Sequence, residues 1–430
     1  MNVRMNAVET ETRLAVRTRR VEGAPVASFR LWVRGGARVE EIPGQAVVTG
    51  RLLSEGTARR GWREIAEQTE ARGMMLTTFG TAECHGIAID ALAGDWELAL
   101  DWAAELLLEP SFPADRCDWV ARQTAAELES LADQPDVVTA WAFLEQLYAP
   151  HPRARPLQGD AASLLALTPE DCAAFHHRTL AGSLLVAAAG TFDAEAVERR
   201  VRERFAGLPA LAAPFPEPPA PVGLEAVRRE VMTPGEDQAH LYAGHLTIPR
   251  DHPDYTALEV VAVVLGAGAG LTGRIPHRIR EQEGLAYSAS AQTIAGAGLD
   301  AGRLVAYVGT SPATVAQAER GVAEEIARLA ADGVTDAELE EARAYLLGRE
   351  PFKRETARQW AEILVEAEHY RLPIDDPELR RQSLEALDRD TVEAAARRHL
   401  RPAELRVTVG LPGEADDPES NEDDEEKDQP

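Results

Sequence analysis

The sequence has few aromatic residues and a shortage of basic charge. Aromatic residues make up 5% of the chain although hydrophobic residues make up 45%. The core should therefore be built mainly from leucine, valine, isoleucine and alanine. Lysine and arginine total 45 against 72 acidic residues, which gives a formal net charge of -27. Nucleic acids and anionic membranes bind preferentially to clusters of basic side chains, so we expect neither as a partner.

Cysteine and long apolar runs are also scarce. Cys84, Cys117 and Cys172 are odd in number and lack Cys-x-x-Cys spacing, as expected of free thiols in a reducing compartment. No apolar run reaches the roughly 18 residues that a bilayer-spanning helix needs, and the N-terminal residues contain no apolar signal segment. We therefore expect a soluble, cytoplasmic protein, and we interpret the acidic segment 414–430 as a disordered tail.

The length of 430 residues indicates at least two domains. A proline-rich stretch over 209–226 is typical of a semi-rigid linker and separates residues 1–208 from residues 227–413. Leu167–Leu180, with a strand that ends at Gly190, lies over Leu387–Leu400, with a strand that ends at Gly410, and both matches have an offset of 220. A constant offset indicates internal duplication. We predict an α+β fold of two homologous domains, each a mostly antiparallel sheet covered on one face by helices.

A glycine-rich stretch dominates the second domain. Gly268, Gly270 and Gly273 match the G-x-G-x-x-G fingerprint, in which glycines let a pyrophosphate approach a helix. The chain breaks at Pro276 and Gly284 before the second parallel strand that this fingerprint requires, so a nucleotide site remains only an alternative. After the glycines, the pattern predicts a short helix, a stop at Gly284 and a strand.

Familiar catalytic motifs are missing. The sequence contains no His-Glu-x-x-His, His-x-x-Glu-His or Gly-x-Ser-x-Gly. His176 and His177 are neighbours that should point apart on a solvated helix. His85 and Glu83 could share one face of a strand, but the sequence offers no third ligand for a metal there.

Two segments nevertheless resemble the pitrilysin/insulinase family of zinc peptidases, which includes the mitochondrial processing peptidases. Ile279–Ser288 resembles the signature of the second half of that family, and Gly44–Thr57 is similar to the stretch where active members read G-x-A-H-x-x-E-H-x-x-x-x-G-T. The resemblance covers nearly the whole chain up to about Gly410. It implies that the two domains form a clamshell.

The zinc residues of the family are largely replaced. On this resemblance, the first histidine ligand falls on Val47, the general-base glutamate on Gly50 and the second histidine on Arg51, while the third ligand is kept as Glu127. A single carboxylate beside an arginine does not hold zinc, and no base remains to activate water. We expect no metal in this chain, no activity of the chain alone, and an ion pair between Arg51 and Glu127.

The resemblance gives Arg280 and Tyr287 a role. In family members that carry this pair, the two side chains hold the substrate backbone and the developing oxyanion, and both are hydrogen-bond donors suited to that task. Some bacterial members are heterodimers in which one subunit carries zinc and its homologue carries this pair. Without that context, Arg280 would be read as a helix-end cation and Tyr287 as an ordinary strand residue.

The resemblance therefore implies a non-catalytic subunit of a heterodimeric zinc metallopeptidase that degrades or processes peptides in an enclosed chamber. Zinc would sit in the homologous partner subunit, and the loop with Gly266, Gly268, Gly270 and Gly273 would line the chamber. The alternative is a scaffold or assembly subunit of the same fold, with no role in proteolysis.

Overall fold

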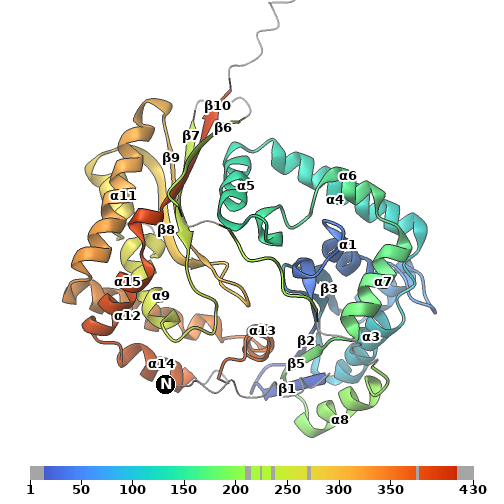
Figure 1. The fold of residues 1–430 in the computed structure, drawn as a ribbon. Coiled ribbons are helices and arrows are strands. Elements are labelled where there is room, and N and C mark those ends of the chain that lie inside the picture. Colours follow the sequence, from blue (N-terminus) through green and yellow to red (C-terminus); the bar gives the residue numbers. More distant parts are fainter. Residues whose placement is uncertain are drawn as a thin grey trace, which may run out of the picture.

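The fold consists of two halves, each built on one five-stranded sheet (Figure 1). The computed structural model describes residues 14–208, 215–222, 225–233, 238–268, 273–373 and 377–413. We call residues 14–208 the first half and residues 225–413 the second half. The predicted domain boundaries at 208 and 227 remain a prediction.

The sheet of the first half has the strand order β1-β5-β2-β4-β3. Only the pair β1–β5 is parallel, and the other three pairs are antiparallel. Leu31 lies opposite both Ile87 and Val186, so this register brings apolar residues of three strands together. The strands are β1 (Leu14–Arg20), β2 (Val26–Arg34), β3 (Met75–Gly80), β4 (Cys84–Leu92) and β5 (Leu184–Gly190).

The second sheet repeats the first strand for strand. Its order is β6-β10-β7-β9-β8, and again only the first pair, β6–β10, is parallel. The helices before β5 and β10 are capped by Thr168 and Asp388, whose numbers differ by 388 − 168 = 220. This agreement confirms the predicted duplication. The strands are β6 (Arg228–Thr233), β7 (Ala239–Leu246), β8 (Ala286–Ala295), β9 (Arg303–Thr310) and β10 (Arg406–Pro412).

Helices of each half cover one face of its own sheet. In the first half, Leu100 and Leu107 pack with Phe29 and Ile89 of the sheet in one apolar cluster. Thr168 and Asp171 form a reciprocal capping box that fixes where the helix before β5 begins. The helices of the first half are α1 (Gln45–Leu52), α2 (Trp62–Glu70), α3 (Trp96–Leu108), α4 (Ala114–Ala132), α5 (Pro135–Tyr148), α6 (Ala161–Ala166), α7 (Pro169–Leu180) and α8 (Ala194–Arg204).

The helices of the second half follow a similar plan. Leu258 and Val261 pack with Val322 and Ile326 against the apolar residues of the second sheet. A π-helical turn, Val263–Ala267, continues the helix before the glycines, and a second one, His277–Gln282, follows them. The helices are α9 (Tyr255–Ala262), α10 (Arg274–Pro276), α11 (Val315–Asp332), α12 (Asp336–Arg349), α13 (Ala357–His369), α14 (Pro377–Glu385) and α15 (Arg389–His399).

Each half contributes one helix that packs on the other half's sheet, on the face that its own helices leave uncovered. Leu364 and Val365 of α13 pack on Leu185 and Ala187 of the first sheet. Reciprocally, α5 packs against the second sheet, where the Phe143 ring lies 5.8 Å from that of Tyr242. Figure 1 shows α5 beside β7 and β10, and α13 beside β5 and β2.

The prediction that helices cover one face of each sheet therefore describes only one of the two helix layers. The interior strand β5 is buried along its whole length, because it has helices on both faces. The exchanged helices supply that second layer.

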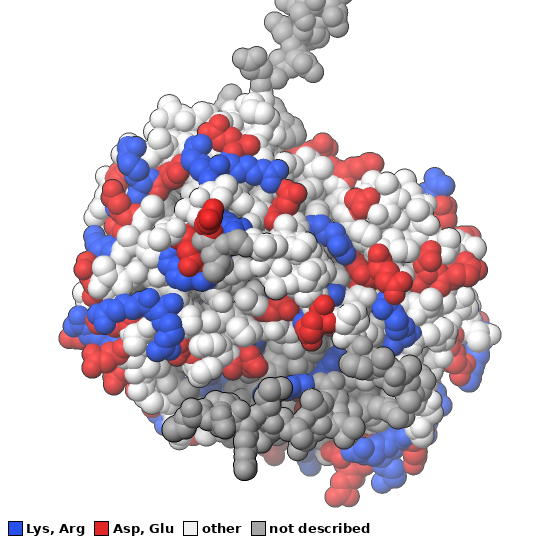
Figure 2. Space-filling view, in the orientation of Figure 1, with Lys and Arg blue, Asp and Glu red and all other residues white. Residues whose placement is uncertain are grey.

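The described surface mixes charges of both signs. Figure 2 shows acidic and basic side chains interspersed on the face in view. Within the described residues, none of the helices combines the length and the apolar character that a membrane span requires.

Candidate functional site

The residues at the degenerate zinc position meet where α1 faces α4. The Arg51 Nη2 donates to Glu127 Oε2 at 2.8 Å, and its Nη1 donates to Thr124 Oγ1 at 2.9 Å. The predicted ion pair is therefore confirmed. Thr124 was not among the predicted site residues, although it lies three residues before Glu127 and so on the same face of α4. The guanidinium places a positive charge beside the only carboxylate kept from the family's ligand set.

This position is also filled by the backbone of β3. Val47 is 4% exposed, and a Cβ added at Gly50 would overlap the carbonyl group of Phe79. The contact is reciprocal, because a Cβ added at Gly80 would overlap the carbonyl group of Ala46. A glutamate side chain cannot project from position 50 unless α1 and β3 move apart. The residues present here do not fit a bound zinc ion or a water-activating carboxylate.

Arg280 and Tyr287 are in contact at the start of β8, which is an edge strand of the second sheet. The Arg280 guanidinium carbon lies 4.7 Å from the centre of the Tyr287 ring, and its Nε lies 3.6 Å from Glu281. Tyr287 is 81% exposed. The predicted helix stop is confirmed at Gly284, which has a φ of 61°. One tight corner thus brings the two donors together and leaves the tyrosine open to solvent.

A β-bulge sets the direction of the Tyr287 side chain. The edge strand β8 pairs with β9 through Ala286 and Ser288, and the register shifts between these two residues. Tyr287 is the extra residue at that shift, so the bulge turns its side chain out of the regular alternation. Bulges of this kind commonly redirect a side chain next to a functional site.

The glycine-rich loop does not have the context of a nucleotide fingerprint. Leu258–Leu265, which would have to be a strand, forms α9 and the π-helical turn. At the base of the loop, a Cβ added at Gly273 would overlap the backbone of Gly266. Gly268 is the last described residue before the loop, and Gly270 lies outside the described residues. Close backbone contact explains why Gly266 and Gly273 are glycines. The role of the glycine-rich loop in lining a chamber remains a prediction.

An ion pair anchors the helix that follows this loop. Arg274 donates to Glu338 from Nε at 2.7 Å and from Nη2 at 2.8 Å, and its Nη2 also reaches the Gly333 carbonyl at 2.9 Å. Burial raises the pKa of Glu338, but hydrogen bonds from Arg274 and from the Thr335 amide outweigh it and bring the pKa to about 2.

We expect the free energy of unfolding of Glu338→Gln to fall less steeply with decreasing pH than that of the wild type. Because the pKa of Glu338 is lower in the folded state, its contribution is present above the ordinary value of about 4.5 and is lost as the pH falls to about 2. After allowance for solvent screening, the contribution is about 1–2 kcal/mol. Urea denaturation between pH 2 and 7 measures it, with Glu341→Gln as a control, since Glu341 is exposed on the same helix. Equal acid dependence in the wild type and Glu338→Gln would contradict this assignment.

The histidines near β4 are buried, which corrects one expectation. His176 was expected to be solvated, but it is fully buried, with its Nδ1 3.1 Å from His85 Nε2 and its Nε2 2.8 Å from the Leu107 carbonyl. Burial lowers the pKa of His176 to about 4 and that of His85 well below its ordinary value. Glu83 has other partners, Arg153 and His369. His85 and Glu83 therefore serve separate structural contacts.

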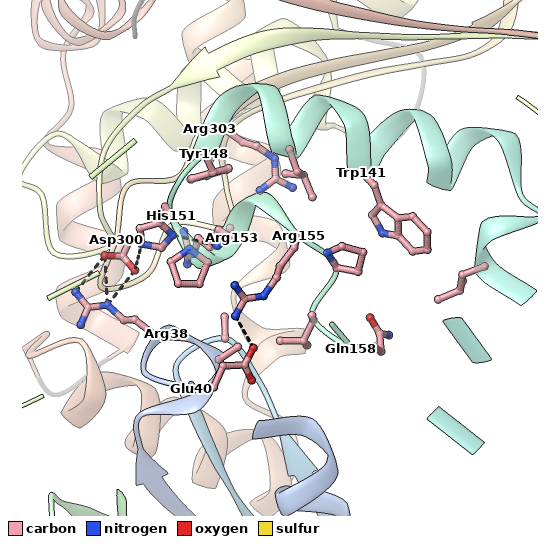
Figure 3. Close-up of a pocket in the computed structure, with 18 residues that line it drawn as sticks. Arg38, Glu40, Trp141, Tyr148, His151, Arg153, Arg155, Gln158, Asp300 and Arg303 are labelled. Atoms are coloured by element: carbon pink, nitrogen blue, oxygen red, sulfur yellow. Dashed lines mark hydrogen bonds and ion pairs between the residues drawn. The ribbon is translucent and has the colours of Figure 1, made fainter. Parts of the chain in front are cut away.

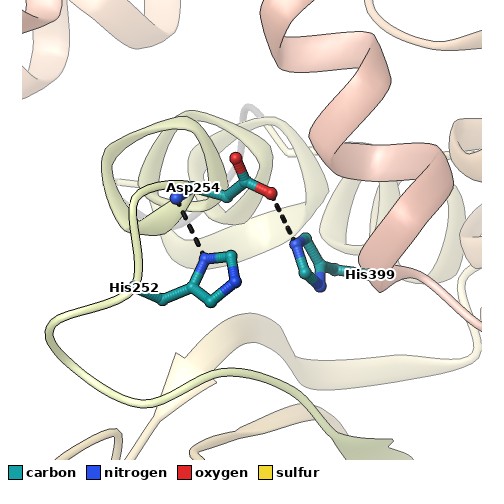
Figure 4. A group of neighbouring side chains, drawn as sticks. All are labelled: His252, Asp254 and His399. Carbon is teal, nitrogen blue, oxygen red and sulfur yellow. Dashed lines mark hydrogen bonds and ion pairs between the residues drawn. The ribbon is translucent and has the colours of Figure 1, made fainter. Parts of the chain in front are cut away.

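A second histidine cluster lies far from these elements. His252, Asp254 and His399 have ligand atoms within 4.8 Å of one another (Figure 4). His399 Nε2 lies 2.7 Å from Asp254 Oδ2, and Arg398 binds the same oxygen. No motif in the sequence indicates this group, because His399 lies far along the chain from His252 and Asp254. The ion pairs account for Asp254 and His399, and the Asp254 amide donates a hydrogen bond to His252 Nδ1 at 3.0 Å. The nearby Arg398 cation opposes a bound metal.

Comparisons with known proteins agree with this geometry. The family model described as insulinase (peptidase family M16) matches residues 15–161, and the model described as the peptidase M16 inactive domain matches residues 166–346. An uncharacterized zinc protease of Mycobacterium leprae is 30% identical over 362 residues, which cover 83% of this chain and 80% of that protein. The non-peptidase homolog YmxG of Helicobacter pylori is 26% identical over 338 residues, which cover 77% and 76% of the two chains.

Solved structures give the same result. The crystal structure of a peptidase M16 inactive domain from Pseudomonas fluorescens superimposes with a TM-score of 0.84 at 26% identity, over 93% of this chain and 96% of that one. The similarity extends through both sheets and their helices.

Proposed function

Because the chain belongs to the insulinase family, peptidase family M16, we propose that it is the non-catalytic subunit of a heterodimeric zinc peptidase. The sequence and the geometry make it a non-catalytic member of that family, since Val47, Gly50 and Arg51 replace the motif and β3 closes the space. The proposal adds that a homologous subunit supplies the zinc and that this chain supplies Arg280 and Tyr287.

The observation that carries the proposal is the contrast between the two positions. Arg51 is tied to Glu127 and Thr124 at the degenerate zinc position, whereas Tyr287 is 81% exposed beside Arg280. A purely structural arginine and tyrosine would gain more from burial and pairing than these two do. An exposed pair of donors is what a substrate held by another subunit requires.

The chemistry assigned to this pair is stabilisation of charge. When water attacks a peptide bond, negative charge develops on the carbonyl oxygen, and a guanidinium and a phenol can both donate hydrogen bonds to it. The zinc of the partner would activate the water. The edge strand β8, which carries Tyr287, also offers backbone groups with which an extended peptide substrate can pair. Substrate binding and oxyanion binding would thus come from one strand.

Purification of the tagged full-length chain from its native cell tests the proposal. We expect recovery of a homologous chain with an intact His-x-x-Glu-His helix, about one zinc per pair of chains, and peptide cleavage only by the pair. Elemental analysis of the separated chains locates the metal. Stoichiometric zinc in this chain alone would refute the proposal, and a homodimer without a zinc-binding homologue would favour the scaffold function.

A further inference from the structure

A cavity of about 400 Å³ lies between the two halves (Figure 3), and neither Arg280 nor Tyr287 lines it. We call it the seam cavity. It is lined by α5 and the loop after it, by first-half residues at positions 37–40, and by the connection between β8 and β9 together with Arg303 at the start of β9. Its volume lies within the usual range for small-molecule sites. The residues that line it are Ala37, Arg38, Glu40, Ala82, Leu131, Trp141, Leu144, Tyr148, His151, Pro152, Arg153, Arg155, Pro156, Leu157, Gln158, Gly296, Asp300 and Arg303.

The lining is basic although the chain is acidic. Four arginines face two carboxylates in the seam cavity, within a protein whose net charge is -27. Three of the arginines have carboxylate partners close by. These pairs are Arg38 with Asp300 at 3.0 Å, Arg153 with Glu83 at 3.1 Å and Arg155 with Glu40 at 2.8 Å.

The carboxylate of Glu40 is well compensated within the protein. It accepts hydrogen bonds from the amides of Gly44 and Ala46 at the start of α1 as well as from Arg155. Asp300 receives Arg38 and lies 3.3 Å from His151 Nε2. Both acidic groups on the wall are therefore already engaged, and they do not serve as free counter-ions for the fourth arginine.

Arg303 is that fourth arginine. Among the described residues it forms no ion pair with a carboxylate, and its Nη1 lies 3.5 Å from the Ala295 carbonyl. Its Nε is buried and has no hydrogen-bond partner within the described part of the chain. Figure 3 shows the guanidinium pointing into the seam cavity next to Tyr148. A guanidinium in such a place is best compensated by an anion from outside, which it can bind through two parallel hydrogen bonds.

Part of the lining of the seam cavity is apolar. Trp141 stands across the space from Arg303 in Figure 3. Leu131, Leu144 and Leu157 also line the cavity. An inorganic anion would leave that surface uncovered. A ligand with an acidic group and an apolar body would contact both sides and would bury the indole face.

We propose that the seam cavity binds a small organic carboxylate, with its carboxylate on Arg303 and its aromatic or aliphatic body against Trp141. This site is independent of the proposed peptidase role. Because its walls belong to both halves, the ligand also joins α5 to the connection between β8 and β9. Binding should therefore raise the thermal midpoint of the full-length protein.

Calorimetric titration of the full-length protein with 1-naphthoate tests the proposal. We expect saturable binding by the wild type and binding at least about tenfold weaker by Arg303→Met, which keeps most of the side-chain volume and removes the charge. The uncharged 1-naphthalenemethanol should bind at least about tenfold more weakly than 1-naphthoate. Trp141→Ala should weaken both ligands, and Arg122→Met, at an exposed arginine on α4, should change neither.

Circular dichroism of each variant establishes that it is folded. The proposal would be overturned if a folded Arg303→Met bound 1-naphthoate as tightly as the wild type, if the alcohol bound as tightly as the acid, or if the wild type did not bind 1-naphthoate at millimolar concentration.

Discussion

Gly50→Ala is expected to lower the free energy of unfolding by about 2 kcal/mol or more. The new Cβ would overlap the Phe79 carbonyl group, and separating α1 from β3 to relieve such overpacking costs about 3 kcal/mol. Alanine in place of a helical glycine returns about 1 kcal/mol, so the net effect is destabilising. Urea denaturation followed by circular dichroism measures the difference.

Gly348→Ala is the matched control. Gly348 also lies in a helix, α12, and nothing stands within 4 Å of a Cβ added there. This substitution should stabilise the protein by about 0.5–1 kcal/mol. If Gly50→Ala had the same effect as Gly348→Ala, the close contact between α1 and β3 would be wrong.

The same contact decides whether the zinc motif can be restored. Val47→His, Gly50→Glu and Arg51→His together would recreate the sequence of an active family member. The glutamate would still meet the backbone of β3 at its first side-chain atom. These three substitutions therefore do not restore a zinc site unless β3 is also moved away from α1.

Arg280→Ala and Tyr287→Phe should each reduce the rate of peptide cleavage by the assembled complex by about 100- to 1,000-fold. Loss of one donor to a developing oxyanion has an effect of that size. Neither substitution should change folding, because Tyr287 is exposed and Arg280 contacts the exposed side chains of Tyr287 and Glu281. The rate constant kcat of the complex should fall more than its KM rises, since the interaction is made mainly in the transition state.

A second arginine–tyrosine pair in the same half provides the control. Arg349 and Tyr345 also stack, with 5.4 Å between the guanidinium carbon and the ring centre, but they lie on α12. Arg349→Ala and Tyr345→Phe should leave cleavage unchanged. Full activity of Arg280→Ala and Tyr287→Phe in a complex with its normal zinc content would point to the scaffold function.

Local structure could be predicted where the chain carries strong local signals. The short helix and the strand predicted on either side of Gly284 are present, as α10 with the second π-helical turn and as β8. The stop at Gly284 was also predicted, because a left-handed residue at a helix end favours glycine. These features depend on nearby residues alone.

Features that depend on distant segments were missed. Nothing in the order of strands indicates that β5 lies between β1 and β2, or that α5 and α13 pack on the sheet of the other half. The burial of His176 has the same origin, because its partner His85 lies on β4. Periodicity describes which face of an element is apolar, but not which element covers it.

The features of the candidate site also fall into those that could be predicted from the sequence and those that depend on distant segments. The Arg51–Glu127 pair could be predicted because the family spacing places both residues at one metal position. The closure of that position by Phe79 could not, since it depends on how closely β3 approaches α1. No motif indicates Arg303 either, because much of the cavity around it is formed by residues of the other half of the chain.

The exchanged helices determine where this protein can move. Parting the halves would strip α13 from β5 and α5 from β10, and would expose Leu364, Phe143 and the sheet residues beneath them to water. That loss of apolar contact opposes any hinge at the proline-rich segment between the halves. This packing therefore favours movement of the two halves together. If the proposed enclosed space exists, a peptide would enter it when the whole chain is displaced relative to the proposed partner subunit.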